Sequence, residues 1–335
     1  MVCEKKQFHS DYIKFEDFSS NLREVYKEKL FELFSGANSN EQSNSSEGSQ
    51  LLKPGRVNSQ RLQKDIASLH DFLVNMSDLT GCLLIMTRDG ETVKNTGTGF
   101  VVKIRKEDCH CPDQQGPSEG QTRHAIVTIS TAYHVFKEGD QMPNPRYAQV
   151  SQAWGSYKAA FILDYNGESK KTMELNNSSF PKLYGYRLIE LDKEPDLDCD
   201  WCAIECLTHE SDLVESLEGK LSKYQAGLAE LYQKSLTVYK DVNLLVIIGH
   251  PHNWSKRISI GKTTTAKEEL RVVRSNQIWC RYYYDSLTCK GSSGAPIFKW
   301  GQPISGFGHW FGHPHNHVGK FGLGGKSTIG VENII

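Results

Sequence analysis

The sequence predicts a mainly β fold in which antiparallel strands close into barrels. From residue 79 onwards, short apolar runs alternate with turn residues, and no pattern of strands separated by regular helices appears. One helical stretch, over residues 207–235, interrupts the strands and divides them into two halves. We therefore expect a first barrel over residues 79–206, a helical connection, and a second barrel over residues 236–335.

The first 78 residues are predicted to be a helical region with a flexible linker at about residues 36–57. Apolar residues recur at helical spacing within residues 19–35 and again within residues 58–75, which indicates two amphipathic helices. The linker is rich in Ser, Asn and Gly and too poor in apolar side chains to form a core. Such helices either pack on their own domain, dock on a partner, or cover a cleft.

Strand patterns fill both halves, and each strand is bounded by turn residues. In the first half, strands are expected at residues 82–87, 97–104, 126–136, 147–154, 157–164 and 183–191. In the second half, they are expected at residues 236–249, 257–264, 270–284, 295–300 and 304–311.

A glycine-flanked serine pair is the candidate nucleophile turn. The sequence Gly-Ser-Ser-Gly at residues 291–294 is followed directly by an apolar strand start at residues 295–298. Glycine adopts backbone angles closed to other residues, so the N–H groups of Gly291 and Ser293 can point into one concavity. Acyl transfer needs an exposed hydroxyl with amide hydrogens beside it. Ser293 is therefore the candidate nucleophile, unless the stretch is simply a surface turn.

Two upstream motifs supply the partners that a nucleophilic serine needs. His134 lies in a short T-A-Y-H-V turn that ends an apolar strand. Asp200 directly precedes the apolar run at residues 201–204, while Asp196 and Asp198 are alternatives. A carboxylate on Nδ1–H holds a histidine in the tautomer whose Nε2 takes the serine proton. We therefore expect His134 as the base and Asp200 as the orienting acid.

These motifs resemble those of the chymotrypsin-like (trypsin-fold) serine peptidases, in which T-A-x-H carries the base, D-h-A-h-h (h, apolar) the acid and G-x-S-G-x-P the nucleophile. The stretch at residues 96–102 is similar to the strand that precedes the histidine in that family. The resemblance covers roughly residues 79–320. It implies two antiparallel six-stranded β-barrels, a cofactor-free and metal-free enzyme, and a triad of His134, Asp200 and Ser293.

The resemblance also implies how the S1 pocket, which holds the side chain before the cleaved bond, is lined. Leu287 lies six residues before Ser293, so no carboxylate there awaits Lys or Arg. Thr288 and His309 are similar to the Thr and His pair that lines S1 in bacterial glutamyl endopeptidases and viral chymotrypsin-like proteases, with Gly308 as the alternative residue at the second position. This similarity implies a preference for Glu or Gln. Lys290 either adds positive charge for an acidic substrate or is simply solvated.

Composition argues against nucleic-acid and membrane partners. The 335 residues include 39 Lys and Arg against 40 Asp and Glu, a formal net charge of −1, so no global field attracts polyanions. The sequence lacks a run of about 18 apolar residues, and no apolar signal follows Met1. Nine cysteines, an odd number without a disulfide-scaffold spacing, predict reduced thiols and a cytoplasmic location.

Neither the cysteines nor the histidines predict a metal site. A structural zinc needs four converging ligands, usually in paired C-x-x-C units, and only one such unit occurs here, at residues 199–202. Cys202 and Cys206 share a strand face that we expect in the barrel core. A run of alternating histidines can bind a transition metal, but here a surface loop is the preferred interpretation. The alternating histidines are His250, His252, His313, His315 and His317.

The leading hypothesis is a serine endopeptidase that acts on a protein or peptide substrate. The alternative is a catalytically weak or inactive protease-fold module that binds a protein partner through the N-terminal helices or the helix at residues 207–235. A self-cleaving protein cut within the linker is a third hypothesis.

Overall fold

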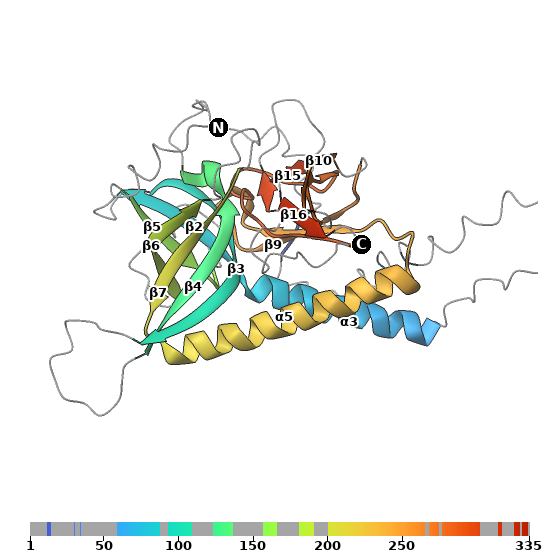
Figure 1. Ribbon diagram of the computed structural model, residues 1–335, viewed down its shortest axis with the longest axis horizontal. Helices are drawn as coiled ribbons and strands as arrows, with labels where there is room; N and C mark the ends of the chain where they lie inside the picture. The colour runs from blue at the N-terminus through green and yellow to red at the C-terminus, as the bar shows by residue number, and fades with distance from the viewer. Residues whose placement is uncertain are drawn as a thin grey trace, which may run out of the picture.

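The computed structural model of the chain is mainly β, with two long helices along one flank (Figure 1). It describes residues 12–14, 30, 34, 59–87, 93–108, 123–136, 157–165, 181–190, 200–264, 268–274, 277–301, 314–316, 325–328 and 330–333. Leu30 and Phe34 of the predicted first helix are helical and buried. The linker, the rest of that helix, and the strands predicted at residues 147–154 and 304–311 lie outside the described residues.

Six antiparallel strands close into a barrel in the order β2-β3-β4-β7-β6-β5 (Figure 1). β2 pairs with both β3 and β5, which closes the ring. Leu83 and Ile85 of β2 share a buried cluster with Val127 and Ile129 of β4, because alternate residues of a strand point to one face. The mainly β fold and a closed first barrel are confirmed. Its strands are Thr80–Thr87 (β2), Val93–Asp108 (β3), Arg123–Ala132 (β4), Tyr157–Ile162 (β5), Lys182–Glu190 (β6) and Trp201–Thr208 (β7).

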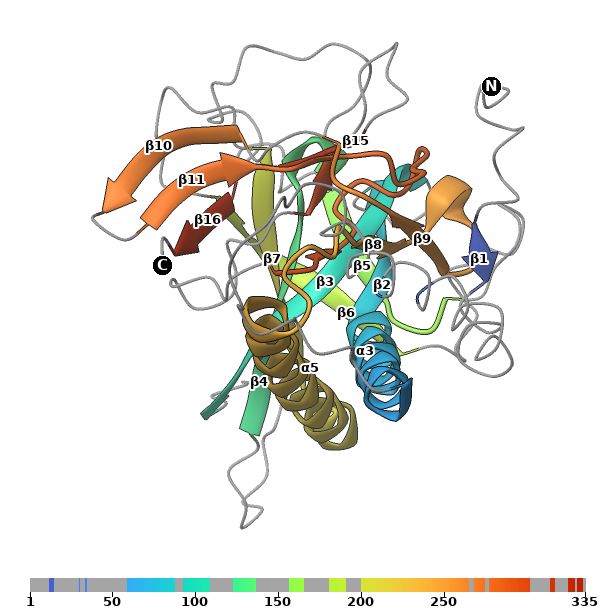
Figure 2. The same ribbon diagram turned by 90° about the vertical axis from the view of Figure 1, so that its right-hand side faces the viewer.

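Two helices, α3 (Ser59–Asp78) and α5 (Ser211–Thr237), lie side by side beneath the sheets (Figures 1 and 2). α3 matches the helix predicted over residues 58–75 and ends three residues later. An ion pair joins the helices, since Nζ of Lys234 on α5 lies 2.7 Å from Oδ1 of the buried Asp65 on α3. Both helices are therefore packed on their own chain.

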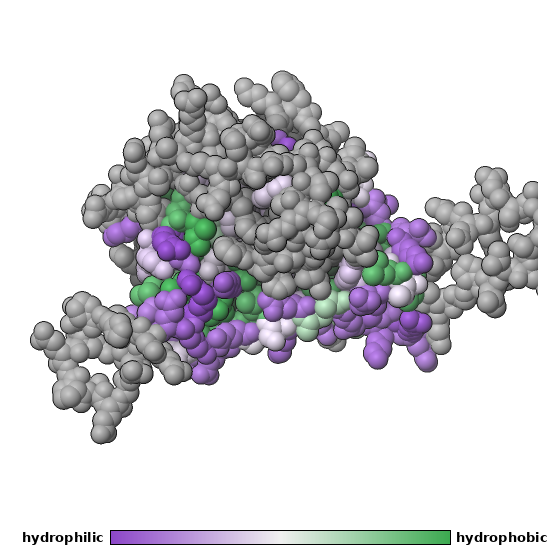
Figure 3. Space-filling model, in the orientation of Figure 1, coloured by the Kyte–Doolittle hydropathy of each residue, from purple (hydrophilic) through white to green (hydrophobic). Residues whose placement is uncertain are grey.

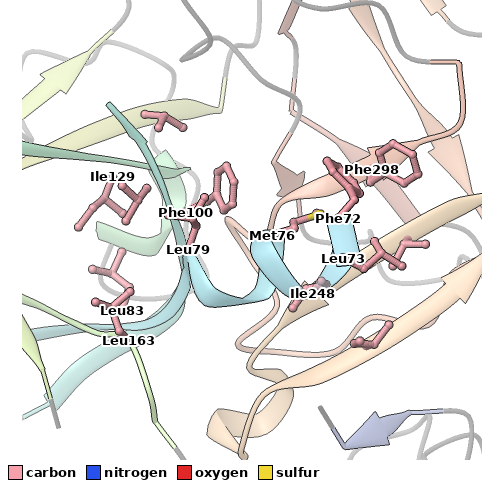
Figure 4. Packing of buried hydrophobic residues seen from close by; sticks show 14 of the residues in the cluster. Phe72, Leu73, Met76, Leu79, Leu83, Phe100, Ile129, Leu163, Ile248 and Phe298 are labelled. Atoms are coloured by element: carbon pink, nitrogen blue, oxygen red, sulfur yellow. The ribbon is translucent and has the colours of Figure 1, made fainter. Parts of the chain in front are cut away.

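The C-terminal half of α3 packs between the first barrel and the second half of the chain (Figure 4). The ring of Phe72 stacks on Tyr224 of α5 at a centroid distance of 5.2 Å and lies 4.7 Å from Phe298 of the second half. Tyr224 in turn meets the edge of Phe100 on β3 at 5.1 Å. One continuous core thus joins the helices to both halves.

The strands of the second half, with β1 from the N-terminal region, form three small sheets among the described residues. Their orders are β1-β9-β8-β13, β10-β11-β16 and β12-β15-β14. The strands are Ile13–Lys14 (β1), Leu245–Gly249 (β8), Arg257–Gly261 (β9), Glu268–Arg274 (β10), Gln277–Arg281 (β11), Tyr283–Tyr284 (β12), Ile297–Lys299 (β13), His315–Asn316 (β14), Gly325–Ser327 (β15) and Gly330–Asn333 (β16). A second closed barrel, and the division into domains, stay predictions.

The second half differs from the prediction in several places. The strand expected over residues 236–249 is confirmed only from Leu245 onwards, because α5 continues to Thr237 and β8 begins at Leu245. The single strand expected over residues 270–284 is wrong, because the chain reverses between Arg274 and Gln277, which pair across a hairpin. The short strand β1, which the prediction missed, pairs Ile13 with Ile258 of β9. Two residues are too few to show a strand periodicity, so this pairing left no signal in the sequence.

Hydrophilic side chains cover much of the described surface along the helical flank (Figure 3). Tyr184 and Leu207 are exposed apolar residues that face each other across β6 and β7. Within the part of the chain that the structure describes, no helix is both long and apolar enough to cross a membrane. The cytoplasmic location stays a prediction.

Candidate active site

The backbone pairing of two barrel strands brings His134 and Asp200 together. His134 lies in a short 3-10 turn, Tyr133–Phe136 (η3), directly after β4, and Asp200 directly precedes β7. β4 and β7 are antiparallel, with Ala132 opposite Trp201, so the end of one strand meets the start of the other. Tyr133 and Asp200 adjoin this register pair, and His134, the next residue after Tyr133, therefore also lies close to Asp200.

The carboxylate of Asp200 contacts His134 at two points. Oδ1 accepts the backbone N–H of His134 at 2.8 Å, and Oδ2 is hydrogen-bonded to Nδ1 of the ring. The backbone of Tyr133 also donates to the carbonyl of Asp200, at 3.0 Å. These three contacts fix the imidazole so that Nε2 points away from Asp200. Asp196 and Asp198, the alternative acids, lie outside the described residues.

The hydroxyl of Ser293 meets that ring nitrogen. Oγ of Ser293 lies 2.7 Å from Nε2 of His134, within the distance at which a serine hydroxyl donates its hydrogen to an imidazole. Ser293 is buried, and its carbonyl accepts the backbone N–H of Thr98 on β3 at 2.8 Å. The nucleophile turn is therefore attached to the first barrel. His134, Asp200 and Ser293 form one connected row of hydrogen bonds.

The peptide groups beside Ser293 have fixed orientations. The carbonyl of Lys290 accepts the N–H of His252 at 2.5 Å, and the carbonyl of Ser292 accepts the N–H of Ala295 at 2.9 Å. In a trans peptide the N–H points opposite to the carbonyl, so these bonds also set the directions of the next N–H groups. Those are the N–H groups of Gly291 and Ser293, and neither has an acceptor among the described residues.

Glycine is required at both ends of this turn. Gly291 and Gly294 have φ angles of +95° and +86°, a region that residues with a side chain rarely adopt. A Cβ on Gly291 would lie 2.4 Å from the carbonyl oxygen of His250. A Cβ on Gly294 would lie 2.1 Å from Oγ1 of Thr131 and 2.2 Å from the carbonyl oxygen of Thr98. Without side chains at these two positions, the turn packs directly against His250 on one side and against Thr98 and Thr131 on the other.

The predicted S1 residues lie in different environments. Thr288 is buried, Leu287 is half-buried and Lys290 is exposed. Lys290 occupies the turn itself, one residue before Gly291. His309 lies outside the described residues. The roles of these four residues in substrate binding stay predictions.

A buried imidazole, that of His315, lies beside the turn that carries Ser293, and the sequence indicated no role for it in the site. The backbone N–H of Gly294 donates to the carbonyl of His315 at 2.8 Å, and the N–H of His315 donates to the carbonyl of Ala295 at 2.7 Å. The His315 side chain is buried, and its Nδ1 lies 2.5 Å from the hydroxyl of Tyr284. The surface-loop prediction for His315 is therefore wrong. His313 and His317, with the same spacing, lie outside the described residues.

The surface-loop prediction is also wrong for His250, which is fully buried and whose carbonyl oxygen lies beside Gly291. Its Nδ1 is hydrogen-bonded to the carbonyl of Trp254 at 3.0 Å. Burial, with the nearby charge of Lys256, lowers the pKa of His250 from 6.5 to about 3. Burial also lowers the pKa of Lys256 to about 8, although Lys256 still donates to the carbonyl of Ser77 at 2.7 Å. His250 is therefore a neutral imidazole at neutral pH.

Replacing His250 with asparagine is expected to remove an acid-dependent loss of stability. A base whose pKa is lower in the folded protein takes up a proton on unfolding, so acid favours the unfolded chain. For His250 the stability is fully present above pH 6.5 and is lost progressively as the pH falls to about 3. One proton corresponds to a slope of about 1.4 kcal/mol per pH unit.

Urea unfolding of both proteins between about pH 4 and 7 measures this slope. Asparagine is a suitable replacement because its amide nitrogen can still donate to the carbonyl of Trp254, which keeps the turn intact. Parallel pH profiles for the two proteins would contradict a depressed pKa at His250.

No group of three or more His, Cys, Asp or Glu side chains gathers to hold a metal ion in the part of the chain that the structure covers. Cys202 and Cys206 are instead buried in the barrel core, as their shared strand face predicted. Cys199 lies outside the described residues.

A serine, a histidine and an aspartate are thus joined by hydrogen bonds in this order, on a β fold whose first half is a closed barrel. No protein-family model matches the chain, and no curated protein matches it. The crystal structure of Deg5 is similar at a TM-score of 0.37 and 12% identity, over 76% of this chain and 87% of that chain. A mutant, inactive form of Rv3671c from M. tuberculosis H37Rv is similar at a TM-score of 0.35 and 9% identity, over 77% of this chain and 83% of that chain. Likenesses of this size assign no family.

Proposed function

We propose that this protein is a serine endopeptidase of the chymotrypsin-like type, with His134, Asp200 and Ser293 as its catalytic triad. The observation that carries the proposal is the row of hydrogen bonds from Asp200 through both ring nitrogens of His134 to Oγ of Ser293, which lies 2.7 Å from Nε2. A serine hydroxyl is activated at neutral pH by an imidazole that accepts its proton and by a carboxylate that orients this imidazole.

In the proposed mechanism, Oγ of Ser293 attacks the carbonyl carbon of the peptide bond while Nε2 of His134 takes its proton. Asp200 stabilises the imidazolium that forms. The N–H groups of Gly291 and Ser293 donate to the negative oxygen of the tetrahedral intermediate. His134 then gives its proton to the leaving amine, which leaves an acyl group on Ser293. A water molecule, deprotonated by His134, attacks this ester and releases the second product.

We further propose a preference for Glu or Gln before the cleaved bond. Leu287 supplies no carboxylate for a basic side chain, and the hydroxyl of the buried Thr288 can hydrogen-bond a carboxylate or carboxamide. His309 is the imidazole that the resemblance implies, and the buried His315 beside Gly294 is a second candidate. A peptide library that varies the residue before the cleaved bond tests this preference, with Lys as the disfavoured comparison.

A fluorophosphonate probe tests the proposed nucleophile directly. Attack by Oγ of an activated serine on phosphorus displaces fluoride and leaves a stable covalent adduct. We expect labelling of the wild-type chain at Ser293 and none in Ser293→Ala. Ser292→Ala is the matched control, because the hydroxyl of Ser292 faces the N–H of Cys289 at 3.4 Å rather than His134. Labelling that persists in Ser293→Ala would remove this serine as the nucleophile.

The alternative function, an inactive protease-fold module that binds a partner, makes the opposite prediction. A folded wild-type chain that the probe does not label would favour that module. Its proposed docking helices receive little support from the fold, because α3 and α5 bury their apolar faces against each other and against the sheets. The endopeptidase hypothesis is therefore preferred.

A further inference from the structure

Thr98 on β3 is a buried junction between three segments of the candidate active site. Its hydroxyl donates to the carbonyl of Gly291 at 2.8 Å and accepts the backbone N–H of His250 at 3.0 Å. Its backbone N–H donates to the carbonyl of Ser293, and its carbonyl accepts the hydroxyl of Thr131 at 2.8 Å. Thr98 therefore contacts the nucleophile turn, the turn that follows β8, and the strand that leads to His134.

The turn that follows β8 also holds the proposed oxyanion site, which is formed by the N–H groups of Gly291 and Ser293. It contains His252 and Asn253 at φ angles of 55° and 60°, which are unusual for residues other than glycine. This conformation presents the N–H of His252 to the carbonyl of Lys290. The turn begins at His250, whose N–H is held by the Thr98 hydroxyl. The direction of the Gly291 N–H thus depends on a turn that Thr98 anchors.

We propose that Thr98 is a positioning residue for the reaction proposed above, and that its hydroxyl keeps the oxyanion site in its active form. The inference rests on the proposed function and adds a residue that touches neither the substrate nor the reacting atoms. The hydroxyl binds both turns at once, because it donates to one and accepts from the other.

Loss of the hydroxyl removes both bonds and leaves two buried backbone groups without a partner. Gly291 is the residue best able to respond, because glycine rotates freely between backbone regions. A rotation of the peptide group between Lys290 and Gly291 would turn the Gly291 N–H out of the oxyanion site. The backbone bond from Thr98 to Ser293 stays in place, so the nucleophile itself keeps its position beside His134.

The test compares Thr98→Val, which keeps the shape and removes the hydroxyl, with Thr98→Ser, which keeps the hydroxyl. A fluorophosphonate probe gives the maximal labelling rate and the half-saturating probe concentration for each protein. Thr80→Val is the matched control, because the buried hydroxyl of Thr80 also donates to a backbone carbonyl, that of Met76 at 2.7 Å, but near α3. Thermal melting measures the stability of every variant.

We expect Thr98→Val to lower the maximal labelling rate by about 10- to 100-fold, less than the loss of a whole oxyanion donor. The half-saturating concentration should stay within about 2-fold, because the proposed defect lies in the transition state and not in probe binding. Thr98→Ser should recover most of the rate. Thr80→Val should lower the melting temperature without slowing the labelling.

Three results would overturn the inference: labelling of Thr98→Val at the wild-type rate, equal losses in Thr98→Val and Thr98→Ser, or an equal loss in Thr80→Val. If Thr98→Val shows no cooperative melting transition, Thr98→Ala is compared with Thr98→Ser, and equal rates in that pair overturn it. A wild-type protein that the probe does not label would instead contradict the proposed function itself.

Discussion

Replacing Asp200 with asparagine is expected to slow the acylation of Ser293 by about 10⁴-fold at neutral pH. The side-chain oxygen of asparagine can still accept the backbone N–H of His134, which now binds Oδ1 at 2.8 Å. Its NH₂ group then faces Nδ1 as a donor, so Nδ1 has to be the unprotonated ring nitrogen. The hydrogen moves to Nε2, and Nε2 can no longer take the proton of Ser293.

The labelling rate of a fluorophosphonate probe, followed as a function of pH, measures this effect. Asp65→Asn is the matched control, because Asp65 is also a buried carboxylate, with Lys234, Arg61 and the hydroxyl of Tyr239 as its partners. It should destabilise the fold and leave the labelling rate unchanged. A rate for Asp200→Asn close to that of the wild type would show that Asp200 does not orient His134.

The residues of the candidate triad could be predicted because each lies where a strand meets a turn. Such a junction can be recognised from a short continuous stretch of sequence. The T-A-Y-H segment spans the end of β4 and the start of η3, the aspartate comes directly before β7, and the Gly-Ser-Ser-Gly turn precedes β13. What the sequence did not contain is the register between β4 and β7. That register decides that Asp200 is the carboxylate which meets His134.

The residues that sequence reasoning missed owe their positions to pairing between distant segments. His315 has the same local pattern as His313 and His317, and it becomes buried because β14 pairs with β15. Thr98 was noticed only as part of a strand motif. Its partners Gly291 and His250 are 193 and 152 residues away, a separation that no local periodicity reveals.

The boundary between β7 and α5 shows how one residue can fit two patterns. Leu207 begins the predicted helical stretch, but in the structure it belongs to β7 and pairs with Ile126 and Tyr184 on either side. A leucine at that position satisfies both the alternation of a strand and the spacing of a helix. Pairing with two neighbouring strands extends β7 to Thr208, and α5 begins at Ser211.

Replacing Phe72 with alanine is expected to lower the free energy of unfolding by about 3–5 kcal/mol. The ring is buried among Tyr224 of α5 and Phe298 of β13, and Gly227 leaves room for it, since a Cβ there would lie 3.1 Å from the ring. Alanine would leave a cavity where α3, α5 and the second half meet. This loss of unfolding free energy is expected only if α3 is part of the hydrophobic core.

Chemical denaturation of the full chain measures the change, and Asp71→Ala on the same helix is the control. The Asp71 side chain is 75% exposed, so its removal should cost less than about 0.5 kcal/mol. A small loss for Phe72→Ala, similar to that of Asp71→Ala, would mean that α3 separates easily from the sheets and is available to a partner. A large loss would show that α3 helps to hold His134 and Ser293 in place. The C-terminal half of α3 packs against the first barrel, which carries His134, and against the second half, which carries Ser293.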